Sequence, residues 1–193
     1  MAPHLPRTAK RTGVKRIVVI GPESTGKSTL SQQLAALYKT EWVPEFARAY
    51  LEGLGRPYEK EDLWHIALGQ LAVEDEAAAR GKDFIICDTD LYVIKVWSEA
   101  KYRDCDPRIL DLIAKRQYHG YLLTYIDIPW EDDPLREHPL PEERTYYYNI
   151  YRDIVINSGV PWADIRGDHN QRLETAATAV RELIYYLGLL LTP

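Results

Sequence analysis

The chain has 193 residues, of which 46% are hydrophobic and 27% are charged, a composition typical of a single globular domain. Its formal net charge is −5, although residues 1–16 contain five basic residues and no acidic one, so the rest of the chain is distinctly acidic. An acidic body argues against a nucleic-acid-binding protein, which needs a basic face. We expect residues 1–15 to form a flexible basic tail and residues 16–193 to form the domain.

The sequence contains no signal for export or for a membrane span. The N-terminus lacks an apolar secretory region, and the apolar run from Leu183 to Leu191 is only about half as long as a membrane helix. Such a run is typical of a buried last helix or of a contact between subunits. The sequence is therefore compatible with a homo-oligomer as well as with a monomer. Cys87 and Cys105 are too few for a disulfide framework, and Cys87 lies in an apolar run that is typical of a core strand. We therefore expect a cytoplasmic protein without stable membrane association.

The first half of the chain alternates short apolar runs with helical patterns. In chain order we predict a strand at 16–20, a helix at 27–38, a strand at 41–44, and helices at 46–54 and 63–80. Asp62 can cap the last of these helices, and Gly81 can end it.

The second half continues this alternation. We predict, in order, a strand at 84–87, helices at 91–100 and 107–118, a strand at 121–128, a helix at 143–158, a strand at 162–165 and a helix at 170–189. Residues 129–142 are rich in proline and charge and too irregular for the core, so we expect them to form an inserted lid. Strands that alternate with helices predict an α/β fold in which helices cover both faces of a parallel sheet.

A glycine-rich loop between the first predicted strand and helix matches the phosphate-binding pattern G-x-x-x-x-G-K-[ST] in full. Gly21 and Gly26 allow backbone conformations in which successive N–H groups point into one concavity, and the following helix adds its positive N-terminal end. Lys27 can reach the β- and γ-phosphates, and the Ser28 hydroxyl can ligate Mg²⁺. We predict that ATP or a similar nucleotide binds here with Mg²⁺, through Gly21, Glu23, Ser24, Thr25, Gly26, Lys27, Ser28 and Thr29.

The segment from Phe84 to Asp88 has four apolar residues followed by a carboxylate and is similar to a Walker B strand. The acid of such a strand lies beside the phosphate loop and holds the metal, often through water. Asp88 therefore joins Ser28 as a predicted magnesium ligand. Asp90 lies two residues further along the chain, where its carboxylate can face the acceptor.

Signatures of two other classes of P-loop protein are absent from the sequence. There is no Asn/Thr-Lys-x-Asp segment to recognise guanine, as a GTPase switch requires, and no L-S-G-G-Q-like segment of a transporter ATPase. The length suits a small-molecule kinase. Arg136 in the predicted lid, or Arg144 just after it, can stabilise charge on a transferring phosphoryl group and help to exclude water.

Five segments carry a more specific pattern and occur in the order Gly21–Ser28, Pro44–Arg48, Ala67–Gln70, Asp88–Asp90 and Trp130–Arg136. Together they resemble the ribosylnicotinamide kinase domain of the bacterial NadR family, in the P-loop nucleoside kinase group, over residues 16–190. The resemblance implies a three-layer P-loop kinase fold with a five-stranded parallel sheet of order 2-3-1-4-5 and a lid. It also implies ATP-dependent phosphorylation of the 5′-hydroxyl of nicotinamide riboside to nicotinamide mononucleotide, a salvage step toward NAD.

The resemblance does not extend to every activity of the family. Longer NadR proteins carry a nucleotidylyltransferase domain with a His-x-Gly-His motif, and none of the five histidines of this chain forms one. Adenylyl transfer and DNA-binding regulation are therefore not expected.

Two carboxylates can accept the proton of the attacking sugar hydroxyl. Glu45 lies at the tip of the second predicted strand, where related nucleoside kinases often place the base, but it can also be a helix N-terminal acid with only a dipole role. Asp88 can instead be the base, which leaves Mg²⁺ to Ser28 and water. Lys27 and Arg136 complete the predicted catalytic set by stabilising charge on the phosphates.

Acceptor binding is expected from residues that follow the strands or line the long helix, namely Glu45, Arg48, Gln70, Asp88, Asp90, Tyr92 and Trp97. Arg48 can anchor phosphate or ribose, or it can be an ordinary surface arginine. Asp90 can bind ribose hydroxyls. Gln70 can bind the carboxamide or the ribose, or it can be an ordinary polar residue of the helix. Tyr92 and Trp97 can form an aromatic wall for the cationic pyridinium ring, or they can simply face the core.

A loop near the C-terminal end, Ile165 to Asp168 followed by Arg172, resembles the loop that wraps the adenine in nucleotide kinases. There the backbone recognises the base and an arginine can stack on it. Gly167, Asp168 and Arg172, together with Arg136, are therefore predicted nucleotide contacts.

Two other functions stay open. A kinase for another nucleoside or for a nucleotide would use the same parts. A nucleotide-binding regulator or phosphoinositide-binding adaptor belongs to a different class, and the basic residues near the N-terminus are its only support.

Overall fold

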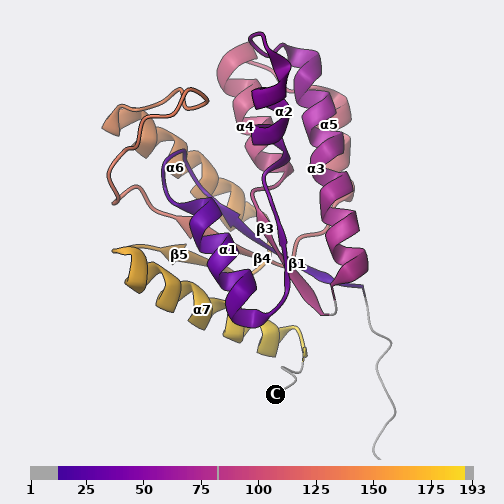
Figure 1. The fold of residues 1–193 in the computed structure, drawn as a ribbon, viewed down its shortest axis with the longest axis vertical. Coiled ribbons are helices and arrows are strands. Elements are labelled where there is room, and N and C mark those ends of the chain that lie inside the picture. Colours follow the sequence, from indigo (N-terminus) through magenta and orange to yellow (C-terminus); the bar gives the residue numbers. More distant parts are fainter. Residues whose placement is uncertain (1–12, 82, 190–193) are drawn as a thin grey trace, which may run out of the picture.

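The computed structural model describes residues 13–81 and 83–189, which form a five-stranded sheet between layers of helices (Figure 1). All four strand pairs are parallel. The strands are β1 (Lys15–Ile20), β2 (Glu41–Val43), β3 (Phe84–Asp88), β4 (Gly120–Thr124) and β5 (Trp162–Ile165). Their order is β2-β3-β1-β4-β5, so the predicted strand order is confirmed.

Successive residues of the central strand serve opposite faces of the sheet. In β1, Ile17 and Val19 pack in one hydrophobic cluster, whereas Val18 and Ile20 pack in another. All four side chains are fully buried, so helices have to cover both faces, as expected for a parallel sheet.

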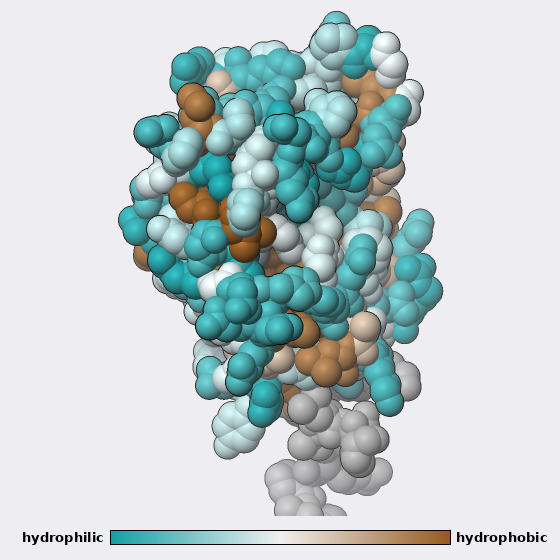
Figure 2. Space-filling view, turned by 60° about the vertical axis from the view of Figure 1, so that its left-hand side comes forward, coloured by the Kyte–Doolittle hydropathy of each residue, from teal (hydrophilic) through white to brown (hydrophobic). Residues whose placement is uncertain are grey.

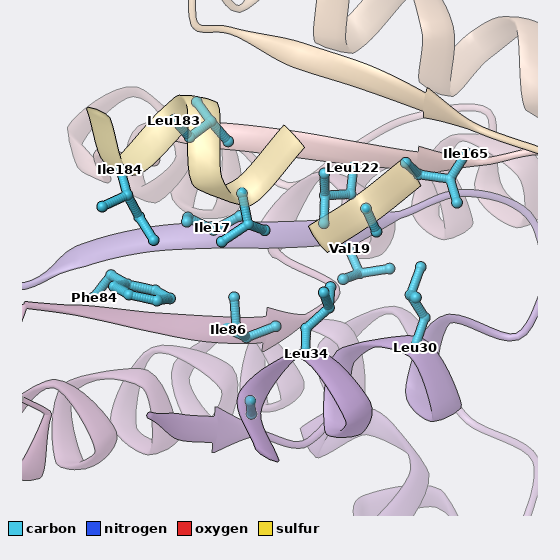
Figure 3. Packing of buried hydrophobic residues seen from close by; sticks show 13 residues of the cluster. Ile17, Val19, Leu30, Leu34, Phe84, Ile86, Leu122, Ile165, Leu183 and Ile184 are labelled. Atoms are coloured by element: carbon cyan, nitrogen blue, oxygen red, sulfur yellow. The ribbon is translucent and has the colours of Figure 1, made fainter. Parts of the chain in front are cut away.

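The described residues form seven helices, namely α1 (Lys27–Tyr38), α2 (Phe46–Leu54), α3 (Lys60–Arg80), α4 (Leu91–Tyr102), α5 (Pro107–Lys115), α6 (Pro141–Asn157) and α7 (His169–Tyr186). Helices α1 and α7 cover one face, where Leu34 and Leu183 pack with Ile17 and Val19 (Figure 3). Helices α3, α4 and α6 contribute to the cluster on the other face. A third cluster joins α2 and α5 to α3 and α4, which stand together in Figure 1.

The fourth strand is shorter than predicted. It ends at Thr124 instead of residue 128 because its neighbours end there: β1 stops at Ile20, where the phosphate loop begins, and β5 stops at Ile165. Residues 125–140 contain no helix or strand, so the irregular segment starts four residues before the predicted lid. It also ends two residues before the predicted end, because α6 begins at Pro141.

Three helix ends lie three residues from their predicted positions. Helix α3 begins at Lys60, and Asp62 is not its cap but lies in its first turn, where its carboxylate accepts the backbone N–H of Glu59 at 2.7 Å. Helix α5 ends at Lys115 because Arg116 takes an extended backbone conformation and its guanidinium pairs with Glu74 at 2.7 Å. Helix α7 ends at Tyr186, shortly before Gly188, whose φ of 66° is left-handed and ends helices.

Several sequence expectations concern the ends of the chain. Most of the predicted basic tail, residues 1–12, lies outside the described residues, and β1 begins within its last part, at Lys15. In the part of the chain that is described, no helix has the length and apolar content needed to cross a bilayer. Cys87 and Cys105 are both buried free thiols, which agrees with Cys87 as a core residue.

Candidate active site

A cavity of about 300 Å³ lies at the carboxyl end of the sheet. We call it the phosphate cavity. The phosphate loop and residues of the lid segment line it. The other lining residues are Glu45, which precedes α2, Arg48 and Leu51 of α2, Val93 and Trp97 of α4, Tyr151 of α6 and His169 of α7. The carboxyl ends of the strands are where ligands bind in open α/β sheets. The side of the molecule that carries the lid and α6 is mainly hydrophilic with small hydrophobic patches (Figure 2).

The phosphate loop is held in its shape by two glycines and by contacts with β4. Gly21 has a φ of 147°, and a Cβ there would lie 2.4 Å from the Thr124 hydroxyl oxygen. Thr124 Oγ1 lies 2.7 Å from Thr25 Oγ1, and the Thr25 hydroxyl donates to the Pro22 carbonyl at 2.7 Å. Only glycine can bring the loop this close to β4, which explains the first position of the phosphate-binding pattern.

The start of α1 points its backbone into the phosphate cavity. Gly26 is the N-cap residue, with a φ of 76°, and provides no side-chain cap for the first N–H groups of the helix. Those N–H groups and the helix dipole therefore face the place that the loop offers to phosphate. The Lys27 ammonium donates to the Pro22 carbonyl at 2.7 Å, which keeps it above the loop.

Two acids stand close enough to Lys27 for its charge to lower their pKa values. Asp88, the last residue of β3, is 1% exposed, and burial raises the pKa of its carboxyl while Ser28 and Lys27 act in the opposite direction. Burial also raises the pKa of Glu45 to about 7, with Lys27 lowering it and Asp88 raising it further. Glu45 is the N-cap residue of α2, but its side chain makes no capping hydrogen bond. Its carboxylate is therefore free to accept a proton.

The Asp88 carboxylate fits the predicted magnesium site. Its Oδ1 is buried without a hydrogen-bond partner, and Ser28 is close enough to affect its pKa. No cluster of three acidic, histidine or cysteine side chains that could bind an ion exists in residues 13–81 and 83–189. Mg²⁺ in phosphate sites commonly takes one or two protein ligands, and phosphate oxygens and water supply the rest. Ser28 and Asp88 would provide such a partial set.

Asp90 does not line the phosphate cavity and is 0% exposed. Its carboxylate accepts the Tyr121 hydroxyl at 2.8 Å and the Tyr92 backbone N–H at 2.9 Å, and it caps α4. The residue between the two acids, Thr89, has a φ of 68°, which is strained for a β-branched side chain. Asp90 thus holds the strained turn that follows Asp88, a role that the sequence did not indicate.

Two other predicted acceptor residues also face the interior. Gln70 is buried, and its Oε1 accepts the Phe46 backbone N–H at 3.0 Å, so it fixes the start of α2 beside Glu45. Tyr92 packs against the hydrophobic cluster that covers one face of the sheet. Arg48 and Trp97, by contrast, line the phosphate cavity.

The lid segment lies on the phosphate loop. Glu23 Oε2 accepts the backbone N–H groups of Glu137 and His138 at 2.9 and 3.2 Å. Ser24 Oγ accepts the backbone N–H of Glu131 at 2.9 Å and the Arg136 guanidinium at 3.3 Å. Arg136 therefore lies where the sequence placed it, at the wall of the phosphate cavity.

The two other arginines considered from sequence are bound to backbone carbonyls. Arg144 is buried and donates to the carbonyls of Ile128 and Ser24, both at 3.2 Å. Arg172 is buried too, pairs with Asp127, and donates to the carbonyls of Thr25, Tyr125 and Gly167, each at 2.8 Å. Both guanidiniums hold the phosphate loop and its neighbouring loops together.

The predicted adenine loop lies next to these contacts. The Gly167 backbone N–H donates to Asp127 at 2.7 Å. The Asp168 side chain caps α7 by accepting the backbone N–H of Asn170 at 2.9 Å and that of Gln171 at 3.0 Å. His169, which follows directly and lines the phosphate cavity, was missed from sequence because a lone histidine at a helix start carries no signal.

A narrow second cavity of about 30 Å³ adjoins the phosphate cavity and shares Glu23, Leu51, Trp97, Leu135 and Tyr151 with it. We call it the aromatic pocket, because the rings of Tyr58, Trp97, Tyr147 and Tyr151 line it. Of these rings, the sequence pointed only to Trp97. Tyr147 and Tyr151 lie on the regular helix α6, where nothing in the sequence distinguishes a pocket residue from a core residue.

Comparisons with known proteins agree with this geometry. Residues 16–172 match the model of a family described as an AAA domain. The chain belongs to this AAA domain family. It is also 25% identical over 187 residues to the trifunctional NAD biosynthesis/regulator protein NadR of Salmonella typhimurium strain LT2, and equally to that of Escherichia coli strain K12. Each match covers 94% of this chain and 45% of the relative, so the chain spans less than half the length of these curated relatives.

Solved structures show the same fold. A crystal structure of NadR protein in complex with NR has a TM-score of 0.79 at 21% identity, covering 95% of this chain and 54% of that chain. Thymidylate kinase from Candida albicans has a TM-score of 0.60 at 15% identity, covering 91% of this chain and 93% of that chain. The predicted P-loop kinase fold and the resemblance to NadR are both confirmed.

Proposed function

We propose that this chain is a kinase that uses ATP to phosphorylate the 5′-hydroxyl of nicotinamide riboside, giving nicotinamide mononucleotide. The observation that carries the proposal is a cavity that Lys27 and Glu45 line, with Asp88 close enough to act on the pKa of Glu45 and an aromatic pocket adjoining it. A phosphate site and an acceptor site side by side are what phosphoryl transfer requires. The match to NadR proteins over 94% of the chain supports the choice of acceptor.

In the proposed mechanism, the phosphate loop and the start of α1 hold the ATP phosphates. Lys27 and Arg136 stabilise the charge that spreads over the transferring phosphoryl group. Mg²⁺, held by Ser28 and Asp88, would neutralise further phosphate charge when bound. Glu45 accepts the proton of the 5′-hydroxyl as its oxygen attacks the γ-phosphorus, and ADP leaves.

The assignment of Glu45 as the base, in preference to Asp88, follows from their surroundings. Glu45 lines the phosphate cavity, makes no capping hydrogen bond and has its pKa raised to about 7, a value suited to a base at neutral pH. Asp88 is buried beside Ser28, which suits a metal ligand better than a group that must reach the acceptor.

A second candidate is a kinase for another nucleoside or for a nucleotide. Its support is the fold shared with thymidylate kinase over 91% of this chain.

An adaptor that binds phosphoinositides would depend on basic residues of which most lie outside the described part, and flotation with anionic liposomes tests it directly. The two free buried cysteines suit a reducing compartment, and we propose the cytoplasm.

An ADP-release assay across a panel of nucleosides, with product masses, tests the proposal. Nicotinamide riboside is expected to give the highest kcat/KM and a product heavier by one phosphoryl group. Lys27→Ala serves as the inactive control, because it removes the ammonium above the phosphate loop. Negligible turnover of nicotinamide riboside beside fast turnover of another nucleoside would contradict the proposed function and favour a kinase for that other nucleoside.

A further inference from the structure

The aromatic pocket is lined by acids as well as by rings. Glu23, from the phosphate loop, and Glu137, from the lid segment, both line it. Within residues 13–81 and 83–189 neither carboxylate forms an ion pair. Glu23 instead accepts two backbone N–H groups of the lid, which leave its negative charge in place.

The basic side chains near the pocket wall have other partners. The Arg144 guanidinium donates to two backbone carbonyls and lies 5.8 Å from the centre of the Trp130 ring. The His138 ring stacks on Tyr147, with centroids 4.3 Å apart, and its Nδ1 is 3.6 Å from a Glu143 carboxylate oxygen. The Lys101 ammonium lies 3.4 Å from the centre of the Tyr58 ring, so a ring of this wall already binds a cation on one face.

The two carboxylates also act on the tyrosine hydroxyls of the pocket. Burial is the main cause that raises the pKa of Tyr58, and the charge of Glu137 adds to it, with a smaller part from Glu23. Burial also raises the pKa of Tyr151, and Glu23 is the first charge that adds to that effect. A field that disfavours a phenolate favours a cation at the same place.

We propose that Glu23, assisted by Glu137, is a specificity-determining residue that makes the aromatic pocket select nucleosides whose base carries a permanent positive charge. This inference rests on the proposed kinase function and adds to it the residue that distinguishes a pyridinium from a neutral ring. Aromatic faces attract such a cation, and nearby carboxylates lower its free energy further, because the partly closed pocket screens charge less than water does.

The pocket has to widen before it can hold a ring, because about 30 Å³ has room for only a few water molecules. Leu135, Glu137 and His138 form the wall that can move, since they belong to no helix or strand. Glu23 binds this wall through the two backbone N–H groups. The residue that attracts the cation is thus also the residue on which the lid rests.

Glu23→Gln tests the role of the charge alone, since the glutamine oxygen can still accept both lid N–H groups. The substrates are nicotinamide riboside and benzamide riboside, a neutral nucleoside whose ring has nearly the same shape. In the wild type, kcat/KM is expected to favour the cation. In Glu23→Gln this preference should fall about tenfold through a higher KM for the cation alone, the order expected for one partly desolvated charge pair.

Two further variants complete the experiment. Glu137→Gln removes the second carboxylate from an exposed lid position and should lower the preference in the same direction. Glu142→Gln removes an exposed acid near the start of α6, outside both cavities, and should leave the preference unchanged. The KM for ATP is measured for every variant, because Glu23 also belongs to the phosphate loop.

The outcomes separate the inference from the function on which it rests. An unchanged preference in Glu23→Gln and Glu137→Gln, with wild-type turnover of nicotinamide riboside, would overturn the inference and leave the proposed function standing. Equal losses on both nucleosides together with a higher KM for ATP would also overturn it, because Glu23 would then serve only the phosphate loop. No turnover of nicotinamide riboside by the wild type would overturn both.

Discussion

Glu45→Gln removes the carboxylate that we assign as the base and keeps the size and polarity of the side chain. Loss of a general base costs on the order of 10²–10⁴ in kcat. Because the Glu45 side chain makes no capping hydrogen bond, α2 should keep its start, and the Kd for ATP should stay close to the wild-type value. Steady-state kinetics with nicotinamide riboside and calorimetry with ATP measure the two quantities.

The pH dependence gives the same prediction a second readout. Burial raises the pKa of Glu45 to about 7, and only the ionised carboxylate can accept a proton. The wild-type kcat/KM should therefore rise with pH through about 7 and be about tenfold below its plateau one pH unit lower. In Glu45→Gln this rise should disappear.

The free energy of unfolding of the wild type should fall over the pH range in which its kcat/KM rises. A carboxyl whose pKa is raised on folding destabilises the folded state when it ionises, so its cost grows as pH rises from the ordinary 4.5 to about 7 and is complete above that. Glu45→Gln should therefore resist urea better than the wild type at pH 8 and equally at pH 4. Wild-type kcat with an unchanged pH profile in this variant would refute the assignment of Glu45 and favour Asp88.

Three further variants test parts that the structure assigns to the metal and to the phosphate loop. Asp88→Asn removes charge from a buried oxygen without a partner and should weaken the apparent affinity for Mg²⁺ by about 10- to 100-fold in magnesium titrations of the activity. Gly21→Ala places a Cβ 2.4 Å from the Thr124 hydroxyl oxygen at a φ of 147° and should cost about 2–3 kcal/mol in urea unfolding. Its control, Gly53→Ala, lies in α2 with open space around it and should be neutral or stabilising. Arg172→Ala leaves Asp127 and several carbonyls without their buried donor and should cost about 3 kcal/mol, whereas a change below 1 kcal/mol would contradict its structural role.

Features that follow directly from strand ends were predictable from the sequence. The phosphate loop follows β1, Glu45 lies two residues beyond the end of β2, and Asp88 is the last residue of β3. Parallel strands bring their carboxyl ends to one edge of the sheet. The strand order followed from the family resemblance and is confirmed. Boundaries were less predictable where a partner element decides them, as at Thr124, where the neighbouring strands end.

Roles that depend on distant partners could not be predicted. Asp90 looks like a substrate ligand in the sequence, but its buried carboxylate accepts a hydrogen bond from the Tyr121 hydroxyl, 31 positions away, and supports the turn after Asp88. Arg172 looks like a base-stacking residue, but its guanidinium reaches the Thr25 carbonyl, 147 positions away. Glu23 accepts a hydrogen bond from the lid segment, which has no helix or strand. Because such a segment has no periodic sequence pattern, its position could not be predicted.

Transfer of a phosphoryl group to nicotinamide riboside is the reaction that we propose for this site. The most direct measurement is the mass of the product formed from nicotinamide riboside, ATP and Mg²⁺ by the purified chain, with ADP release followed in the same reaction. We expect nicotinamide mononucleotide in equal amount to ADP, and none with Lys27→Ala. ADP without nicotinamide mononucleotide, or neither product while another nucleoside is phosphorylated rapidly, would contradict it.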